Sequence, residues 1–237
     1  MFDIHAHILP NIDDGAENIE ESLKLIEMLK AHGVTAVAAT PHFYAEVMSF
    51  DEYCVKVDEG FNLVKSRLND DSIKLIKGFE VKYFRGISQI EGLKKLSIGD
   101  SNYILIELPY GLDITDRVID EIADITYNFG MTPILAHLER YHKYHGFKKA
   151  VSLVDSGLAM AHINSSSLLD GYKKCAIGLI ETGVASLMAT DTHSILTRPP
   201  MINEAIKVIE KNLGSETVET LIKNSKRIYK AITNEKL

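Results

Sequence analysis

Residues suited to metal chemistry recur along this chain at regular spacings. His5 and His7 stand two residues apart, and Asp191 and His193 repeat that spacing far along the chain. Side chains two residues apart on a strand point to the same face, so each pair can present two ligands to one place. Imidazole and carboxylate groups without thiolates suit Zn²⁺, Mn²⁺ or Fe²⁺.

Further ligand-type residues follow the same logic. They are Asp14, His42, Glu80, Glu107 and His137. Eight of the nine residues end a stretch that reads as a buried strand, and Asp14 lies in the first loop. Taken singly, any of them is more often a helix cap or a salt-bridge partner, but the repetition at successive strand ends favours a metal site. Nine ligands exceed the need of one ion, so we expect two or three divalent ions that share a bridging carboxylate.

Apolar, β-branched segments position these residues. The candidate strands are residues 2–7, 34–40, 73–81, 103–108, 132–137, 158–164 and 185–190. They are continuously apolar, which is typical of parallel strands buried on both faces. Their ends recur about every 30 residues, the length of one βα unit. A parallel βα barrel gathers strand ends at one mouth, where active sites form.

Helical patterns separate the strands. Asn18 is expected to cap a helix together with Glu21, and Gly33 to end it. Other helices are expected to end near Gly130, Gly157 and Gly183, and two more to fill residues 201–211 and 215–232. No G-x-G-x-x-G or Walker-type loop is present, which disfavours an open nucleotide-binding sheet. We therefore predict an α/β fold, a distorted (β/α)7 TIM-like barrel, with residues 1–237 as one domain.

Composition restricts the class of protein. The net charge of −7 disfavours nucleic-acid binding, and no apolar stretch approaches the roughly 20 residues that span a bilayer. A ligand motif follows Met1 almost at once, so we expect no signal peptide, and two cysteines fit a reducing cytoplasm. A cysteine-based phosphatase needs Arg six residues after its Cys, but Gly60 and Glu181 stand there.

The remaining candidates are interpreted more conservatively. His32 is expected at a helix C-terminus, and His142 and His145 on a solvated surface. Asp13 is interpreted as a turn residue beside Asp14. His162 precedes Asn164 by two residues on one predicted strand, so it could line the barrel interior.

Several motifs match a known superfamily in order. The segment His5-Ala-His, then Asp14-Gly15, Thr40-Pro41-His42, Gly78-Phe79-Glu80, His137 and Asp191-Thr192-His193 resemble the PHP superfamily of polymerase and histidinol phosphatase domains. Residues 5–16, Glu107-Leu108-Pro109, 137–141 and Arg198-Pro199-Pro200 resemble more closely the bacterial metal-dependent protein-tyrosine phosphatases of capsule and exopolysaccharide gene clusters. The likeness covers essentially the whole chain.

The resemblance implies a (β/α)7 barrel with three metal ions, with manganese as the usual activator and iron, zinc, cobalt or magnesium as alternatives. By position, one ion would be held by His5, His7, Glu80 and Asp191. Glu80 would bridge to a second ion, completed by Glu107 and His137. The third would be held by Asp14, His42 and His193.

The implied reaction is hydrolysis of a phosphate monoester. Arg140 and Arg198 could bind the phosphate as catalytic cations. The resemblance implies a phosphotyrosine protein as substrate, specifically a bacterial tyrosine kinase of polysaccharide export. A histidinol-phosphate or other small-molecule phosphatase is the alternative, and a PHP nuclease is disfavoured by the charge.

Four positions depart from the family pattern. Phe43 stands where a second His is usual, and Lys82 stands where an Arg is frequent. Leu138 replaces a Pro, and Thr192 replaces a small residue. None of these changes removes a predicted metal ligand, but Phe43 and Lys82 bear on the leaving-group pocket and so on substrate choice.

Overall fold

Parallel strands alternate with helices along residues 1–45 and 50–233, the part of the chain that the computed structural model describes. The strands are β1 Phe2–Ala6, β2 Ala36–Ala39, β3 His42–Phe43, β4 Lys74–Lys77, β5 Glu80–Lys82, β6 Tyr103–Glu107, β7 Thr132–Leu135, β8 Met160–Asn164 and β9 Leu187–Ala189. The helices are α1 Ile19–Ala31, α2 Phe50–Arg67, α3 Asp116–Phe129, α4 Phe147–Asp155, α5 Lys173–Glu181, α6 Ile202–Leu213 and α7 Ser215–Thr233.

Two of the predicted strands are each broken into two short ones. The second divides into β2 and β3 around Pro41, and the third divides into β4 and β5 around Gly78. The pairing nevertheless runs through both breaks, because Gly78 N–H donates to Ala39 O at 2.9 Å and Glu80 N–H donates to Pro41 O at 3.0 Å. Each broken pair therefore serves as one barrel strand, and the described chain provides seven in sequential order.

The first strand contains a register shift next to the ligands. Asp3 pairs with Val37 and Ala6 pairs with Ala39, so two residues on β1 lie opposite one residue on β2. Such bulges turn side chains and are frequent beside active sites. Here the extra residue falls at Ile4 and His5, just where the ligand motif begins.

Contacts between the first and last strands close the sheet. Ala6 forms an isolated parallel bridge with Thr192. His7 N–H donates to Thr192 O at 2.9 Å, and Asp191 N–H donates to His5 O at 2.8 Å. The two ligand-bearing pairs of the sequence therefore lie side by side although more than 180 residues separate them.

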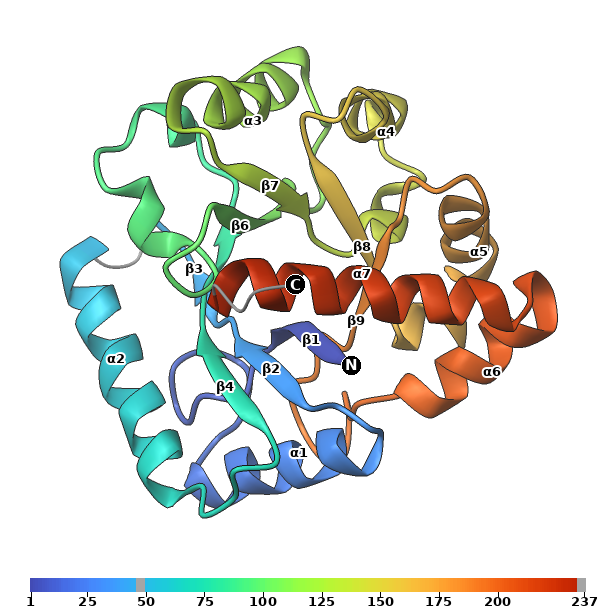
Figure 1. The fold of residues 1–237 in the computed structure, drawn as a ribbon. Helices are drawn as coiled ribbons and strands as arrows, with labels where there is room; N and C mark the ends of the chain where they lie inside the picture. The colour runs from blue at the N-terminus through green and yellow to red at the C-terminus, as the bar shows by residue number, and fades with distance from the viewer. Residues whose placement is uncertain (46–49, 234–237) are drawn as a thin grey trace.

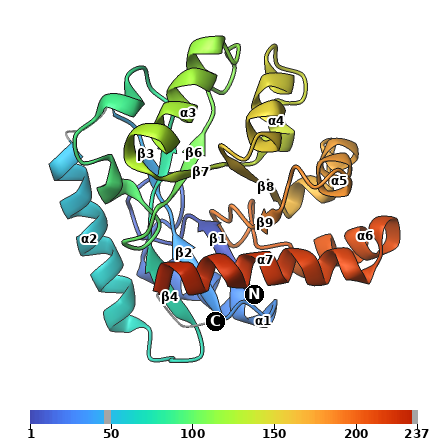
Figure 2. The same ribbon diagram turned by 45° about the horizontal axis from the view of Figure 1, so that its top comes forward.

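Helices surround the strands, and α7 covers one end of the barrel. Figure 1 shows α7 running across the end where the N-terminus lies, and the turned view in Figure 2 agrees. The ring of Phe2 meets that of Tyr229 edge-on at 5.5 Å, and Phe2 N–H donates to Ser225 Oγ at 3.4 Å. The carboxyl ends of the strands, where the predicted ligands stand, are therefore at the opposite end.

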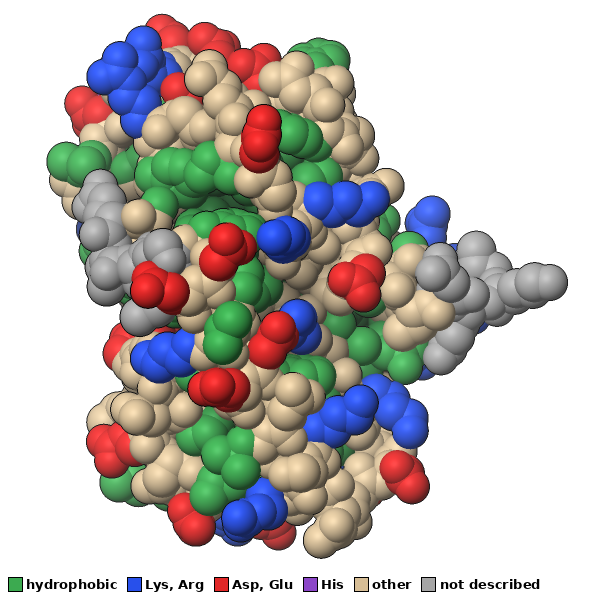
Figure 3. All heavy atoms as spheres, turned by 90° about the vertical axis from the view of Figure 1, so that its left-hand side faces the viewer, with side chains coloured by type: hydrophobic (Ala, Val, Ile, Leu, Met, Phe, Trp, Pro, Cys, Tyr) green, Lys and Arg blue, Asp and Glu red, His purple; other side chains and the backbone are tan. Residues whose placement is uncertain are grey.

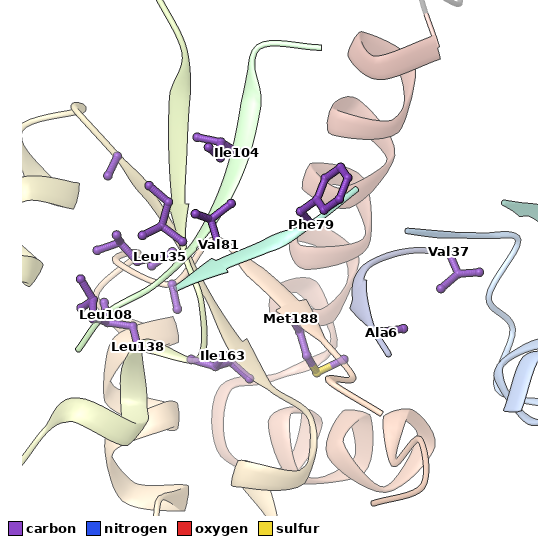
Figure 4. Packing of buried hydrophobic residues seen from close by; sticks show 14 of the residues in the cluster. Ala6, Val37, Phe79, Val81, Ile104, Leu108, Leu135, Leu138, Ile163 and Met188 are labelled. Carbon is purple, nitrogen blue, oxygen red and sulfur yellow. The ribbon is translucent and has the colours of Figure 1, made fainter. Parts of the chain in front are cut away.

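Apolar side chains fill the space on both sides of the strands. One cluster, part of which is shown in Figure 4, joins the strand residues Val81 and Leu135, and Phe79 just before β5, to the surrounding helices. A second cluster packs Phe2 and Ile134 against residues of α7 such as Ile228. The barrel end under α7 is therefore filled with apolar side chains, and the polar groups lie at the other end.

Helix α1 confirms its predicted cap. Asn18 Oδ1 accepts the N–H of Glu21 at 2.9 Å, and Gly33 follows the helix with a φ of +80°. In a capping box the Glu21 carboxylate would accept the N–H of the cap residue Asn18. Here it accepts the N–H of Glu17, one residue earlier, at 3.0 Å.

Helix α2 is absent from the sequence-based prediction. Its buried residues are Tyr53, Val57, Gly60 and Val64, which follow helical spacing. Glycine costs about 1 kcal/mol in a helix relative to alanine, which weakened the local signal. A Cβ at position 60 would stand 3.1 Å from Cδ1 of Ile12 in the first loop, so a larger residue would require that side chain to shift by a few tenths of an ångström.

The outer surface mixes charged and apolar groups. Seen from the side on which α2 lies, hydrophobic side chains gather in a hollow in the upper half of the molecule (Figure 3). Among the helices within residues 1–45 and 50–233, none combines the length and the hydropathy required to cross a membrane.

Candidate metal centre

All nine predicted ligands lie in the described part of the chain, at or just after the carboxyl ends of the strands or in the first loop. His5 lies in β1, His42 in β3, Glu80 in β5 and Glu107 in β6, while the other five follow strands or occupy loops. Distances between their ligand atoms place them in one cluster. His137 and Asp191 reach it from left-handed backbone, with φ of +35° and +51°.

Four ligand atoms converge on one point. Nε2 of His5 and Nε2 of His7 lie 3.0 Å apart. Oε2 of Glu80 and Oδ1 of Asp191 each lie 3.3–3.4 Å from both of these nitrogens. A tetrahedron with metal–ligand bonds of about 2.1 Å has edges of about 3.4 Å. Five separations among these atoms are close to that edge, so His5, His7 and Glu80 fit around one ion, with Asp191 in reach of the same two nitrogens.

Glu80 offers its second oxygen to a neighbouring position. Oε1 of Glu80 lies 3.0 Å from Nε2 of His137, and that nitrogen lies 3.9 Å from Oε1 of Glu107. One oxygen thus faces the His5–His7 pair and the other faces His137. This is the arrangement of a carboxylate that bridges two ions.

A third group forms at the mouth of the barrel. Oδ1 of Asp14 lies 3.4 Å from Nε2 of His42 and 3.5 Å from Nε2 of His193. With His7, these residues offer ligand atoms that all lie within 4.8 Å of one another. The Asp14 carboxylate is 65% exposed, so this group is the most open to solvent.

Residue His42 also approaches the bridging carboxylate. His42, Glu80 and Glu107 form a further group with ligand atoms within 4.8 Å. Nδ1 of His42 lies 2.7 Å from Oε2 of Glu80, but neither atom has a hydrogen-bond partner within the described residues. Buried polar atoms without partners are costly, and a divalent ion bound beside both atoms would remove that cost.

The charges of the cluster also require cations. The carboxylates of Glu80, Asp191 and Glu107 crowd into a nearly dry space, and burial together with the nearby Glu80 charge raises the pKa of Glu107 to about 7. Burial alone would raise the pKa of Asp191, but the charge of His5 and a hydrogen bond from His7 hold it well below its usual range. Desolvation lowers the pKa of His137 and His193, which favours the neutral imidazole that a metal ligand must be. The donor set therefore fits divalent ions.

One residue interpreted as a turn residue has a second role. Asp13 Oδ1 accepts the N–H of Gly15 at 2.9 Å, as a turn residue would. Its Oδ2 accepts the Nδ1–H of His7 at 2.7 Å and the backbone N–H of His42 at 2.9 Å. A carboxylate behind a metal-binding histidine orients the ring and selects its tautomer. The only signal in the sequence was the adjacent pair Asp13-Asp14.

The strand β8 contributes two further polar residues to the interior. His162 Nε2 lies 3.0 Å from Nδ1 of His5, and Asn164 Nδ2 donates to Oδ2 of Asp191 at 2.6 Å. His162 therefore lines the barrel interior, as its spacing from Asn164 suggested. Neither residue belongs to the three ligand groups, and both contact a member of one.

The two predicted phosphate-binding arginines meet at one atom. Arg140 Nη2 lies 3.1 Å and Arg198 Nη2 lies 2.8 Å from Oδ2 of Asp191. Arg198 Nη1 also lies 3.8 Å from Asp14. The side chains are 25% and 37% exposed, so both guanidinium groups stand between the ligand cluster and solvent.

Other histidines lie outside this cluster. His32 follows α1, and its Nδ1 accepts the N–H of Asn203 at 3.2 Å. His142 meets the ring of Tyr172 at 5.6 Å, and His145 is exposed. These positions agree with the structural roles expected for them.

Two of the four departures from the family pattern, Phe43 and Lys82, differ in where they lie. Phe43 is 2% exposed and packs on Phe50 and Tyr53, so it belongs to the core. Lys82 is exposed, and its ammonium lies 5.2 Å from the centre of the Tyr44 ring. Lys82 therefore lies at the border of the site, whereas Phe43 packs in the hydrophobic core behind it.

Known structures share this architecture. A crystal structure from work on YwqE of Bacillus subtilis and CpsB of Streptococcus pneumoniae, described as metal-dependent tyrosine phosphatases, has a TM-score of 0.83 and 28% identity, covering 100% of this chain and 96% of that chain. Dihydroorotase of Campylobacter jejuni has a TM-score of 0.54 at 13% identity, over 96% and 82% of the two chains, and shares the fold alone. The predicted distorted barrel is confirmed.

Relatives and a family model cover the same length. Tyrosine-protein phosphatase YwqE of Bacillus subtilis is 30% identical over 97% of this chain and 92% of its own. Tyrosine-protein phosphatase CpsB of Streptococcus agalactiae serotype III is 28% identical over 97% and 98%. The model for capsular polysaccharide synthesis, CpsB/CapC, matches residues 1–230 and so spans every strand and every predicted ligand. On that match, this chain belongs to the CpsB/CapC family of capsular polysaccharide synthesis.

Proposed function

We propose that this chain is a metal-dependent protein-tyrosine phosphatase that acts in the control of capsular or exopolysaccharide synthesis, with residues 1–237 forming one catalytic domain. The observation that carries the proposal is the convergence of the ligand groups, joined through Glu80, beneath Arg140 and Arg198. The relatives CpsB and YwqE are named tyrosine-protein phosphatases, and this supports the same activity for the present chain.

The ligand groups divide naturally among three ions. His5, His7, Glu80 and Asp191 would hold the first, Glu80, Glu107 and His137 the second, and Asp14, His42 and His193 the third. Bound divalent ions supply Lewis acidity toward a phosphoryl oxygen and toward a water molecule. The mixed imidazole and carboxylate set suits Mn²⁺, Fe²⁺ or Zn²⁺. We propose manganese because the family resemblance implies it, with iron, zinc, cobalt or magnesium as alternatives.

The chain's own cations complete the phosphate site. Arg140 and Arg198 each present a planar fork of N–H donors beside Asp191, and such forks bind phosphate oxygens in bidentate fashion. In the structure both forks contact Oδ2 of Asp191, which holds them in place toward the mouth. A phosphate that arrives there meets two preoriented donors rather than two mobile side chains.

The leaving group explains the choice of phosphotyrosine. A phenol has a pKa of about 10, whereas an alkyl alcohol is far less acidic, so a phenolate departs with less help from a general acid. A serine or histidinol ester would demand more of such a group. The open side of the cluster at Asp14 also leaves room for a protein substrate.

We further propose a phosphorylated bacterial tyrosine kinase as the substrate protein and the cytoplasm as the compartment. Both cysteines are free, which suits a reducing environment. The net charge of −7 supports a protein partner over a nucleic acid.

The deciding experiment compares three substrates side by side. The protein is stripped with a chelator and reloaded with Mn²⁺, and kcat/KM is measured for a phosphotyrosine peptide, a phosphoserine peptide and histidinol phosphate. We expect activity only after metal is restored, and the highest value for phosphotyrosine. A tenfold preference for histidinol phosphate would overturn the tyrosine assignment, and full activity of the stripped protein would overturn the metal mechanism.

A further inference from the structure

A groove of about 520 Å³ opens beside the candidate metal centre. Its walls come from the segments that follow β3, β5 and β6, and they include Tyr44, Tyr83, Arg85, Tyr110 and Leu112. It is continuous with the centre, because the Tyr44 ring stacks on the ring of His42 with centroids 5.1 Å apart. None of the predicted ligands lines it.

The strands that carry the ligands also build the groove. Lys82 stands two residues after Glu80, and Pro109 stands two residues after Glu107. Glu80 and Lys82 both lie on β5, so their side chains share a face, while Pro109 lies just beyond the end of β6. A substrate bound at the metal centre would therefore have the groove beside it, on the side where Tyr44 contacts His42.

One wall of the groove is apolar and exposed. The side chain of Tyr110 is 54% exposed and that of Leu112 is 68% exposed. Tyr110 is held by the rings of Tyr141 and Tyr144, at centroid distances of 6.2 Å and 5.8 Å. Exposed apolar groups that cluster beside a site are typical of a binding surface.

The opposite wall is cationic. Lys82 and Arg85 line the groove, and the charge of Arg117 acts with that of Arg85 on the neighbouring Tyr83. One carboxylate, Glu121, lies near these cations, and its Oε2 accepts the hydroxyl of Tyr83 at 3.0 Å and the N–H of Gly86 at 2.8 Å. The charges of Lys82, Arg85 and Arg117 outnumber that of Glu121, so this wall carries a net positive charge on a protein of net charge −7.

From this combination we infer that the groove selects phosphotyrosine substrates in which acidic and apolar residues flank the phosphotyrosine. The flanking carboxylates pair with Arg85 and Lys82, and an apolar side chain packs on Tyr110 and Leu112. This inference rests on the proposed function, because it concerns the peptide that carries the phosphate. Arg85 is then a specificity-determining residue that lies outside the catalytic cluster.

The acidic character of the peptide that binds in the groove follows from charge complementarity. The protein as a whole repels an acidic peptide, so a preference for acidic flanks requires local cations. Lys82 and Arg85 are both exposed, and an exposed ion pair contributes at most about 1 kcal/mol, so two or more flanking carboxylates together support about tenfold discrimination against amides of the same shape. The apolar wall supplies affinity that does not depend on salt.

The test uses matched peptides and the Mn²⁺-loaded protein. One phosphotyrosine peptide carries two Glu and one Leu on each side, the second has Gln in place of Glu, and the third has Lys. We expect kcat/KM for the Glu peptide to exceed that for the Gln peptide by about tenfold at 0.15 M salt. In R85E the preference should disappear and the Lys peptide should become the better substrate.

A matched variant tests whether the effect belongs to the groove. Lys223→Glu changes charge by the same amount on exposed α7, across the other end of the barrel, and should keep the preference of the unmodified protein. Equal rates for the Glu and Gln peptides, or an unchanged preference in R85E, would overturn the groove assignment while the phosphatase assignment stands. If no phosphotyrosine peptide is hydrolysed, the proposed function itself fails.

Discussion

Oδ2 of Asp13 lies 2.7 Å from Nδ1 of His7, and the other nitrogen of the same ring faces Glu80 and Asp191 at 3.4 Å and 3.3 Å. One carboxylate in the first loop therefore fixes the orientation of a ring whose free nitrogen points into the centre. The same Oδ2 accepts the backbone N–H of His42 and so ties the first ligand motif to the second.

Asp13→Asn should weaken metal binding without removing a ligand. Loss of a carboxylate behind a metal-binding histidine costs about 10- to 100-fold in metal affinity. Calorimetric titration of the stripped protein with Mn²⁺ measures this change directly. Asp71→Asn, on an exposed turn, is the control. Equal affinities in the two variants would show that Asp13 only shapes the turn.

Substitutions of the histidines should separate ligands from structural residues. His7→Ala and Asp191→Asn are expected to abolish turnover and lower the bound metal, because each removes a member of the four-atom group. His32→Ala and His145→Ala should retain turnover within a few-fold, since neither side chain reaches the cluster. Elemental analysis alongside an aryl phosphate assay distinguishes the two pairs, and equal losses in all four would refute the division.

Arg140→Ala should impair catalysis and leave the metal in place. We expect kcat/KM to fall roughly 100-fold, which corresponds to about 3 kcal/mol of lost transition-state stabilisation. Arg140→Lys should recover only part of the loss, because an ammonium cannot form the fork. A lowered metal content in Arg140→Ala would instead mean that its contact with Asp191 maintains the centre.

Tyr141→Phe should destabilise the fold near the mouth. The hydroxyl of fully buried Tyr141 donates to the carbonyl of Leu108 at 2.8 Å, directly after the ligand Glu107. Its removal leaves a buried carbonyl without that partner, at a cost of about 1–2 kcal/mol. Urea unfolding of the variant should show a lower midpoint with an unchanged slope. Tyr127→Phe, at a side chain 70% exposed, should unfold like the unmodified protein.

The thiol of Cys175 should respond to pH in a defined direction. Burial, followed by the charge of Glu139, raises its pKa to about 11 in the folded protein. The unfolded chain then loses this proton first, so the free energy of unfolding falls as pH rises from about 9 toward 11. Cys175→Ser should flatten this part of the stability curve measured by urea unfolding. In a Cys54→Ser background, alkylation of the folded protein should still accelerate above pH 9, and a plateau below pH 9 would contradict the raised pKa.

The residue types of the candidate centre and the order of the strands that carry them could be predicted from the sequence. Predicted ligands such as His5 and Glu107 stand where apolar strand patterns end, and that signal is local. The cap at Asn18 and the glycine at position 33 were equally readable, because caps depend on residues within one turn of the helix.

How these residues come together depends on long-range pairing that the sequence pattern does not show. The bulge in β1 and the breaks at Pro41 and Gly78 follow from pairing between distant strands, which local periodicity does not encode. Gly60 weakened the helical pattern of α2 in the sequence. This glycine packs against Ile12 in the first loop, which lies 48 residues earlier in the chain.

The role of each polar group in the centre was likewise a matter of three-dimensional position. Asp13 and Asp14 are adjacent and chemically identical, yet one orients His7 from behind and the other faces His42 and His193. Hydrogen bonds and ion pairs depend on distances of a few tenths of an ångström, and barrel closure sets those distances between residues far apart in the chain.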